Sequence, residues 1–179
     1  MFKTLLASLA ILCTSVPSLA QSNHANHQLL IEAVKKTGVT VYVNPDDVCN
    51  PKTTGRGKFF GFYAGADQIM VICQEEALKR GVYNTQYVWT EEDYDTLRHE
   101  SHHLVQDCRD KSLNAKLHTV YTKPLAFAGN VLSKNRFSWV VETYADRGDE
   151  MVVLELEAFS VAQLNDPLEQ IEDIKRYCM

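Results

Sequence analysis

The sequence predicts an α+β protein in which a small sheet of three strands comes before a helical half. β-branched and aromatic runs gather between residues 39 and 73, whereas helical periodicity dominates from Thr90 onward. Strands and helices grouped in this way are typical of α+β domains and not of alternating α/β domains. Residues 21–179 are numerous enough for one domain with its own core, and no repeat or linker divides them.

Residues 1–20 have the layout of a secretory signal peptide. Lys3 stands near the start, an apolar run extends over residues 5–16, and Pro17-Ser18-Leu19-Ala20 follows, so we expect cleavage after Ala20. The apolar run is shorter than the roughly 20 residues that span a bilayer, and no later segment is long and uncharged enough to do so. We therefore expect a secreted or periplasmic protein without a membrane span.

The three strands follow a first helix over about residues 27–37, which should end at Gly38, a typical C-terminal cap. Residues 39–43 are β-branched and aromatic, and Asn44-Pro45 should end this strand. Residues 58–63 and 68–73 form two further strand-like runs around a four-residue turn, which is the spacing of a hairpin.

The helical half begins with a clearly delimited helix. Thr90 is a good N-cap residue, and three acidic residues follow it at the positive end of the helix dipole, which predicts a helix over about residues 91–108. Further helices are expected at about 114–129 and 149–165, and shorter helical pieces near 136–145 and 168–177.

The helix after Thr90 carries His99-Glu100-x-x-His103, the H-E-x-x-H pattern of zinc proteases. Residues four apart lie about 40° apart around a helix, so both imidazoles can face one cation while Glu100 flanks them. His102 points about 80° away from the pair, and we interpret it as a supporting or surface residue. In the alternative interpretation, the two histidines merely share the exposed face of an amphipathic helix.

A catalytic zinc site usually has three protein ligands, and the acidic residues downstream are the candidates for the third one. Glu142 begins an E-x-x-x-D pattern that ends at Asp146. Glu155 and Glu157 lie in a segment that is apolar almost all round, where a buried carboxylate needs a cation or another partner. Burial does not separate these two glutamates, and either could instead be a half-exposed helix residue.

A resemblance to a known family favours one of them. The chain resembles the gluzincins, the glutamate-ligand branch of the zincin metallopeptidases, through His99-Glu100-x-x-His103 and Glu157-Ala158-Phe159-Ser160-Val161-Ala162. The second stretch is similar to the E-A-x-x-x-A run that small gluzincin-like proteins place on the helix after the metal helix. The chain also resembles small secreted HExxH proteins of cyanobacteria and their phages, and the similarity covers about residues 39–165.

This resemblance implies a compact zincin-like domain that binds Zn²⁺ through the two histidines and Glu157. Glu142 is the second choice for the third ligand. Val161 stands where larger gluzincins have an aspartate, so the partner of the first histidine would have to be Asp107 or Asp146.

The implied activity is hydrolysis of peptide bonds by a secreted zinc metalloendopeptidase. Glu100 would act as the general base on a water whose pKa the zinc lowers, and would then pass the proton to the leaving nitrogen. Tyr144 or Tyr121 could donate to the oxyanion, although packing is the simpler role for each. An exposed sheet edge could bind an extended peptide by strand pairing. The alternatives are a zinc-stabilised binding protein without turnover and an amidase that acts on cell-wall peptides.

Four of the five cysteines follow residue 20, and an even number in an exported chain indicates two disulfides. Of the three possible pairings we favour Cys49 with Cys73 and Cys108 with Cys178. A zinc–thiolate site is disfavoured because no C-x-x-C pair occurs. The net charge of −5 at pH 7 argues against nucleic acid and anionic membranes as partners. The partner that the implied activity predicts is a peptide or protein substrate.

Overall fold

The structure is a computed structural model that describes residues 19–55, 57–164 and 166–179. The predicted signal peptide, residues 1–20, lies outside the described residues except for its last two, which begin helix α1 (Leu19–Lys36). Helix α1 starts earlier than the predicted helix over 27–37. It ends two residues before Gly38, whose φ of 97° is a conformation that favours glycine.

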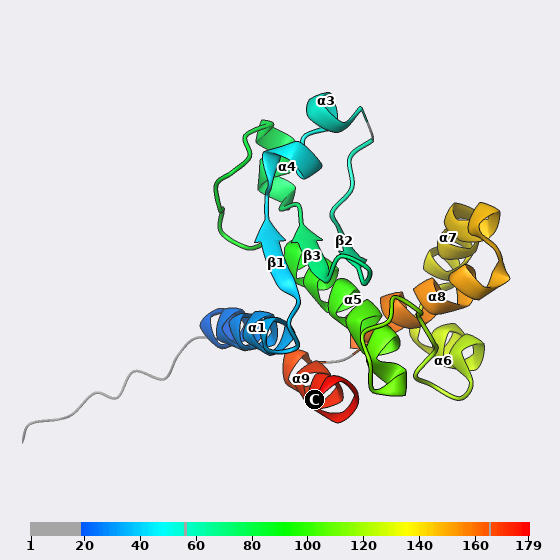
Figure 1. Ribbon diagram of the computed structural model, residues 1–179. Helices are drawn as coiled ribbons and strands as arrows, with labels where there is room; N and C mark the ends of the chain where they lie inside the picture. Colours follow the sequence, from blue (N-terminus) through cyan, green and yellow to red (C-terminus); the bar gives the residue numbers. More distant parts are fainter. Residues whose placement is uncertain (1–18, 56, 165) are drawn as a thin grey trace, which may run out of the picture.

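The three predicted strands are present and form one sheet in the order β1-β3-β2 (Figure 1). Strand β1 (Thr40–Val43) is parallel to β3 (Ile69–Ile72), and β2 (Gly61–Ala64) is antiparallel to β3. The central strand β3 is the most buried of the three, with Met70, Val71 and Ile72 at 1% exposure or less. Because β3 lies between the other two strands, β1 and β2 are both edge strands.

The helices account for most of the remaining chain. Those of the first half are α2 (Asp46–Cys49), α3 (Pro51–Thr54) and α4 (Glu75–Arg80), none of which the sequence predicted. Those of the second half are α5 (Glu91–Asp107), α6 (Pro124–Val131), α7 (Lys134–Tyr144), α8 (Asp149–Leu164) and α9 (Pro167–Cys178), with 3-10 turns η1 (Cys108–Asp110) and η2 (Ala145–Arg147). The predicted α+β class is confirmed.

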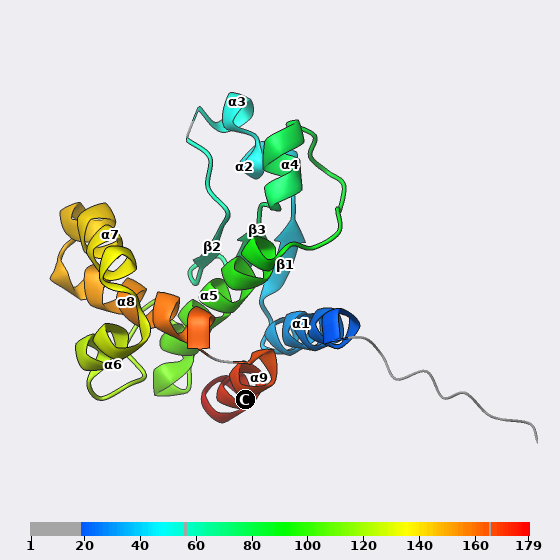
Figure 2. The same ribbon diagram turned by 180° about the vertical axis from the view of Figure 1, so that it is seen from behind.

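Helix α5 lies at the centre of the molecule. In both views the sheet lies on one side of α5 and α8 packs on another, while α1 and α9 pack together at one end (Figures 1 and 2). The largest buried apolar cluster joins α1, the sheet, α5 and α9 through residues such as Leu30, Met70, Leu97 and Ile174. A second cluster joins α6, α7 and α8. The first cluster thus fixes the position of α5, and the second fixes the position of α8.

The predicted helix over 114–129 is wrong in its first ten residues, because only Pro124–Val131 is helical. Pro124 disfavours the helical conformation of the residue before it, and Lys123 has φ −135° and ψ 66°. The N–H groups of Val120 and Tyr121 donate instead to the Glu157 carboxylate, at 2.9 and 3.0 Å. A buried acceptor on α8 therefore satisfies backbone groups that a helix would have paired internally.

The structure contains the disulfides Cys49–Cys73 and Cys108–Cys178, which is the pairing that the sequence favours. The first joins the end of α2 to the residue after β3, and the second joins α9 to the residue that follows α5. Two disulfides are compatible with an extracellular location. Among the described helices, none is both long enough and apolar enough to cross a membrane.

Candidate metal centre

Helix α5 begins where the sequence predicted, because Thr90 and Asp93 form a reciprocal capping box at its first turn. The Thr90 hydroxyl accepts a hydrogen bond from the Asp93 N–H at 3.3 Å, and the Asp93 carboxylate accepts one from the Thr90 N–H at 2.9 Å. Leu97 and Leu104 pack into the main core. This packing fixes the rotation of α5 about its axis and therefore the direction in which its histidines point.

His99 and His103 converge as their spacing predicts. Their Nε2 atoms lie 3.0 Å apart, and both rings are buried. The carboxylate of Glu100, also buried, has its ligand atom within 4.8 Å of the two imidazole nitrogens. The motif thus forms one cluster of potential metal ligands, and not two histidines on an exposed face.

Glu155 of α8 is the acidic residue that meets this histidine pair. Its Oε2 atom lies 3.2 Å from His99 Nε2 and 3.6 Å from His103 Nε2, and the side chain is buried. Three potential ligand atoms from two helices therefore point at one position.

Glu157, the predicted third ligand, is bound elsewhere. Its Oε1 atom accepts hydrogen bonds from His102 Nε2 at 2.9 Å and Gln106 Nε2 at 3.1 Å, in addition to its two bonds to the backbone of the loop before α6. Residues two apart lie about 200° apart around a helix, so Glu155 and Glu157 cannot both face the histidine pair. Glu155, and not the predicted Glu157, is therefore the glutamate that lies against the histidine pair. His102 is also buried and not a surface residue.

The other acidic candidates lie away from the histidines. Glu142 is exposed on α7, and Asp146 is exposed in η2. Asp107 is buried at the end of α5, where it accepts hydrogen bonds from the Tyr63 hydroxyl at 2.7 Å and the Asn114 N–H at 3.1 Å. Asp107 therefore holds the β2 hairpin and the following loop against α5, and does not orient a histidine.

Gln106 is a functional candidate that the sequence reasoning missed. Its Oε1 atom lies 2.7 Å from His103 Nδ1, and its Nε2 donates to the Leu154 carbonyl at 3.1 Å. A carbonyl oxygen can only accept, so the amide nitrogen faces Leu154 and the amide oxygen accepts the Nδ1 proton of His103. His103 then presents an Nε2 lone pair to the cluster. The signal was the spacing of three residues, which places Gln106 beside His103 on one face.

The pKa shifts show that the cluster stabilises positive charge beside Glu155. Burial alone would raise the pKa of Glu155, but the adjacent His103 and His99 outweigh it and hold the pKa far below its usual range. Burial would lower the pKa of His103, but Glu155 outweighs it and raises that pKa to about 9. Burial raises the pKa of Glu100, against the opposing charges of the two histidines.

Strand β2 brings unpaired main-chain groups to this cluster. The Phe60 carbonyl accepts from the Cys73 N–H at 2.6 Å, so alternate residues of β2, Gly61 and Tyr63, direct their main-chain groups away from β3. The Tyr63 backbone is close enough to Glu100 to lower the pKa of its carboxyl, which agrees with this direction. The close approach requires a glycine, because a Cβ at Gly61 would lie 2.7 Å from Thr96 Cγ2 and from the Val71 carbonyl.

Residues 18–179 match the model of the family DUF8637, which is described as a domain of unknown function. The chain belongs to this family. No curated protein matches the chain, and no solved structure does so either.

Two tyrosines of the DUF8637 domain were candidates to support the chemistry, and the structure separates them. Burial, together with the nearby charges of Glu155 and Glu100, raises the pKa of Tyr144, whose ring centroid lies 6.5 Å from that of Phe159. Tyr121 instead stacks on Phe127 with ring centroids 4.1 Å apart. Tyr144 therefore borders the cluster, whereas the Tyr121 ring packs against α6.

The DUF8637 cluster fits a cation such as Zn²⁺ on the chemistry of its donors. Two imidazoles and a carboxylate are a common ligand set of catalytic zinc. The buried Oε2 of Glu155 has no hydrogen bond of good geometry, although it lies against both histidine rings. A buried carboxylate oxygen that is aimed at two imidazole nitrogens without bonding them well suits a shared metal ligand set.

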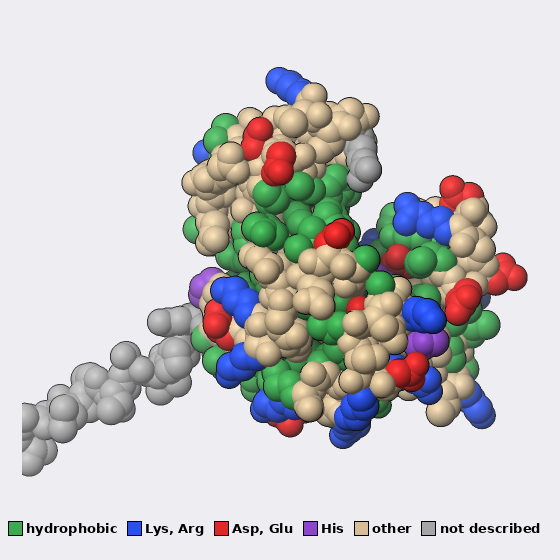
Figure 3. Space-filling view, in the orientation of Figure 1, with side chains coloured by type: hydrophobic (Ala, Val, Ile, Leu, Met, Phe, Trp, Pro, Cys, Tyr) green, Lys and Arg blue, Asp and Glu red, His purple; other side chains and the backbone are tan. Residues whose placement is uncertain are grey.

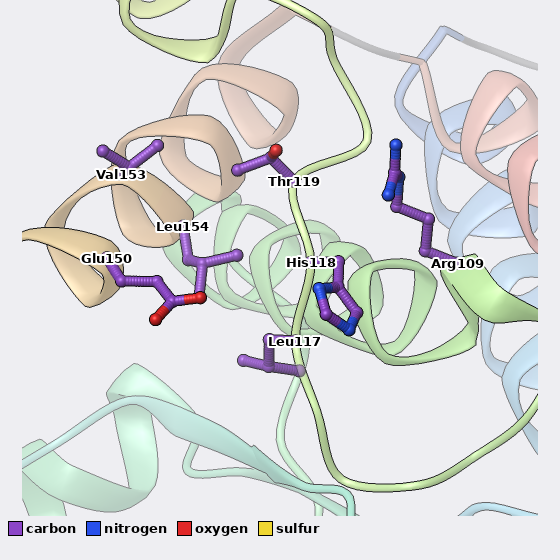
Figure 4. Close-up of a pocket in the computed structure, with 7 residues that line it drawn as sticks. All are labelled: Arg109, Leu117, His118, Thr119, Glu150, Val153 and Leu154. Atoms are coloured by element: carbon purple, nitrogen blue, oxygen red, sulfur yellow. The ribbon is translucent and has the colours of Figure 1, made fainter.

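One cavity of the DUF8637 domain is separate from this cluster. It has a volume of about 310 Å³ and lies between η1, the loop before α6 and the start of α8 (Figure 4). It is lined by Arg109, Leu117, His118, Thr119, Glu150, Val153 and Leu154. None of the histidine or glutamate side chains of the cluster lines it, and only Leu154 is adjacent to one of them in the sequence.

Proposed function

We propose that this protein is an exported zinc-dependent peptidase whose metal ligands are His99, His103 and Glu155. The observation that carries the proposal is the convergence of the two Nε2 atoms and Glu155 Oε2, with Glu100 beside them. The spacing of H-E-x-x-H supports the proposal independently of the structure. The signal-peptide pattern of residues 1–20 and the disulfides support export.

The bound zinc would polarise the substrate carbonyl and lower the pKa of a water at the site. Glu100 would take a proton from the water whose oxygen attacks the carbonyl carbon, and would give that proton to the nitrogen that leaves when the C–N bond breaks. The raised pKa of Glu100 suits both steps, because a general base is most effective when its pKa approaches the working pH. Tyr144 donates its hydroxyl proton as a hydrogen bond to the carbonyl oxygen as negative charge develops there.

An extended peptide would bind along the free edge of β2. Gly61 and Tyr63 turn their N–H and C=O groups outward at this edge, beside Glu100. Main-chain pairing at a sheet edge is a common way of binding a peptide without a fixed sequence. It places the peptide bond next to the ligand cluster.

Metal content and peptide cleavage, measured together, test this function. The exported full chain should contain about one zinc per molecule by mass spectrometry and should cleave a mixture of unlabelled peptides. Glu100→Gln should keep its zinc and lose cleavage by at least about 100-fold, because it removes only the base. Unchanged cleavage in Glu100→Gln, or wild-type protein that holds zinc and cleaves no peptide, would contradict a peptidase and favour a binding protein.

A further inference from the structure

Arg136 of α7 lies over two aromatic rings, one of which contacts the ring of His99. Its guanidinium carbon lies 4.5 Å from the ring centroid of Phe159 and 4.6 Å from that of Trp139. The Phe159 ring in turn lies 4.2 Å from the ring of His99. A single aromatic ring therefore separates the guanidinium from a proposed metal ligand.

The aromatic pair fixes the orientation of this cation and leaves its donors available. Trp139 and Phe159 meet edge to face, at 5.6 Å and 77°. Stacking uses the faces of a guanidinium, whereas its five N–H donors lie in its plane. In the part of the chain that the structure describes, none of the ion pairs within 4.0 Å involves Arg136.

Arg136 lies on the surface of α7. Figure 3 shows a hollow between the part of the molecule that carries β2 and the part that carries α7, with Lys and Arg side chains on the α7 rim. Arg136 and Trp139 are both exposed, the latter at 44%. Arg136 also acts on Glu92 of α5, whose pKa burial raises and Arg136 lowers.

The ligand that suits such a group is a carboxylate. A planar guanidinium forms two parallel hydrogen bonds with a carboxylate, and its aromatic platform reduces the entropy lost on binding. Glu92 of α5, on which Arg136 acts, would repel a substrate carboxylate unless a cation compensated it. Arg136 provides that cation one aromatic ring away from His99.

Building on the proposed peptidase function, we propose that Arg136 binds a carboxylate of the substrate next to the scissile bond. This carboxylate is either an Asp or Glu side chain or the free C-terminus of the peptide. Arg136 is then a specificity-determining residue, and the enzyme prefers acidic or C-terminally free peptides to their amides. Arg147 is the competing candidate, since it lies 5.1 Å from the ring centroid of Tyr144.

Paired substrates test the proposal. Each peptide is compared with a twin in which Asp or Glu is replaced by Asn or Gln, or in which the C-terminus is amidated, so that the two sources of the carboxylate are distinguished. The wild-type kcat/KM should be at least about tenfold higher for the carboxylate in one of these two pairs. In Arg136→Gln this ratio should fall to about one. Lys134→Gln removes the same charge from the same helix and should keep the wild-type ratio.

A binding measurement separates this inference from the proposed function. Zinc-loaded Glu100→Gln should bind the carboxylate peptide at least about tenfold more tightly than its amide twin in a calorimetric titration, and adding Arg136→Gln should remove the difference. Equal affinity for both twins, or a preference lost in Arg147→Gln and kept in Arg136→Gln, would overturn the role of Arg136 even if peptides are cleaved. If this binding preference were found but the wild-type protein cleaved no peptide, the peptidase function would be contradicted and the role of Arg136 would stand.

Discussion

Two neighbouring glutamates of α8 occupy different environments because they point to different sides of the helix. Glu155 lies against His99 and His103, whereas Glu157 receives hydrogen bonds from two side chains and two backbone N–H groups. Through Gln106, Glu157 still supports the orientation of His103. The two glutamates should therefore respond differently to the same substitution.

We predict that Glu155→Gln lowers zinc affinity by more than about 100-fold, because it weakens a direct ligand. Glu157→Gln should lower it by about 10- to 100-fold, the usual cost of changing a partner of a ligand. It should also lower the free energy of unfolding by about 1–3 kcal/mol, because it weakens a buried charged acceptor. Competition with a chromogenic chelator measures the affinities, and Glu142→Gln on the exposed face of α7 is the control. A greater loss of zinc in Glu157→Gln than in Glu155→Gln would refute the assignment.

At the same scale, His27 of α1 should make the stability depend on pH. Burial lowers its pKa from 6.5 to about 4, and its Nε2 atom lies 2.8 Å from the Arg98 guanidinium. The folded state holds His27 neutral, whereas the unfolded state takes up a proton below about pH 6.5. The free energy of unfolding should therefore fall as the pH drops from about 6.5 to 4.

Urea unfolding at several pH values checks this prediction. His27→Gln should show a shallower fall in stability over the same interval. Gln28→Ala, which changes an exposed residue of the same helix that does not titrate, should keep the wild-type slope. An identical slope in wild type and His27→Gln would show that other groups cause the pH dependence.

At the scale of elements, the contact between β2 and α5 depends on one glycine. A Cβ at Gly61 would meet Thr96 and the Val71 carbonyl at 2.7 Å, so Gly61→Ala must push the strand away from α5. We expect a loss of about 1–3 kcal/mol in the free energy of unfolding, typical of overpacking. Peptide cleavage should fall more than zinc affinity, because the histidines lie on α5, whereas the strand edge that we propose to bind the peptide belongs to β2.

Gly57→Ala is the matched control, because a Cβ there would meet no atom within 4 Å. Calorimetric melting, zinc titration and peptide cleavage should all be close to wild type in this variant. If Gly61→Ala were as stable and active as Gly57→Ala, the close packing of β2 on α5 would not matter for the site.

For the whole molecule, the disulfide Cys108–Cys178 fastens the last helix, α9, to the end of α5. The two cysteines are 70 residues apart, against 24 for Cys49–Cys73. In the chain-entropy model, the double variant Cys108→Ser, Cys178→Ser opens the larger loop and should lower the free energy of unfolding by about 4 kcal/mol. Opening the smaller loop should lower it by about 1 kcal/mol less. Urea unfolding of the two double variants measures this difference, and the opposite order would contradict the model for this chain.

The sequence by itself determined the features that depend on neighbouring residues. The capping residues around Thr90 placed the start of α5, the β-branched runs placed three strands, and the four-residue spacing of His99 and His103 placed two imidazoles on one face. The partners of Glu155 and Glu157 could not be read in this way. Both lie in a helix that is apolar almost all round, so periodicity does not show which side faces α5.

Only the tertiary structure decided which glutamate meets the histidines and why residues 114–123 are not helical. Both answers have one cause, the rotation of α8 about its axis as it packs between α5, α6 and α7. This rotation turns Glu155 towards the histidine pair and Glu157 towards the loop, where its carboxylate replaces the internal hydrogen bonds of a helix. Packing between segments that are distant in the sequence sets this angle, and no local pattern records it.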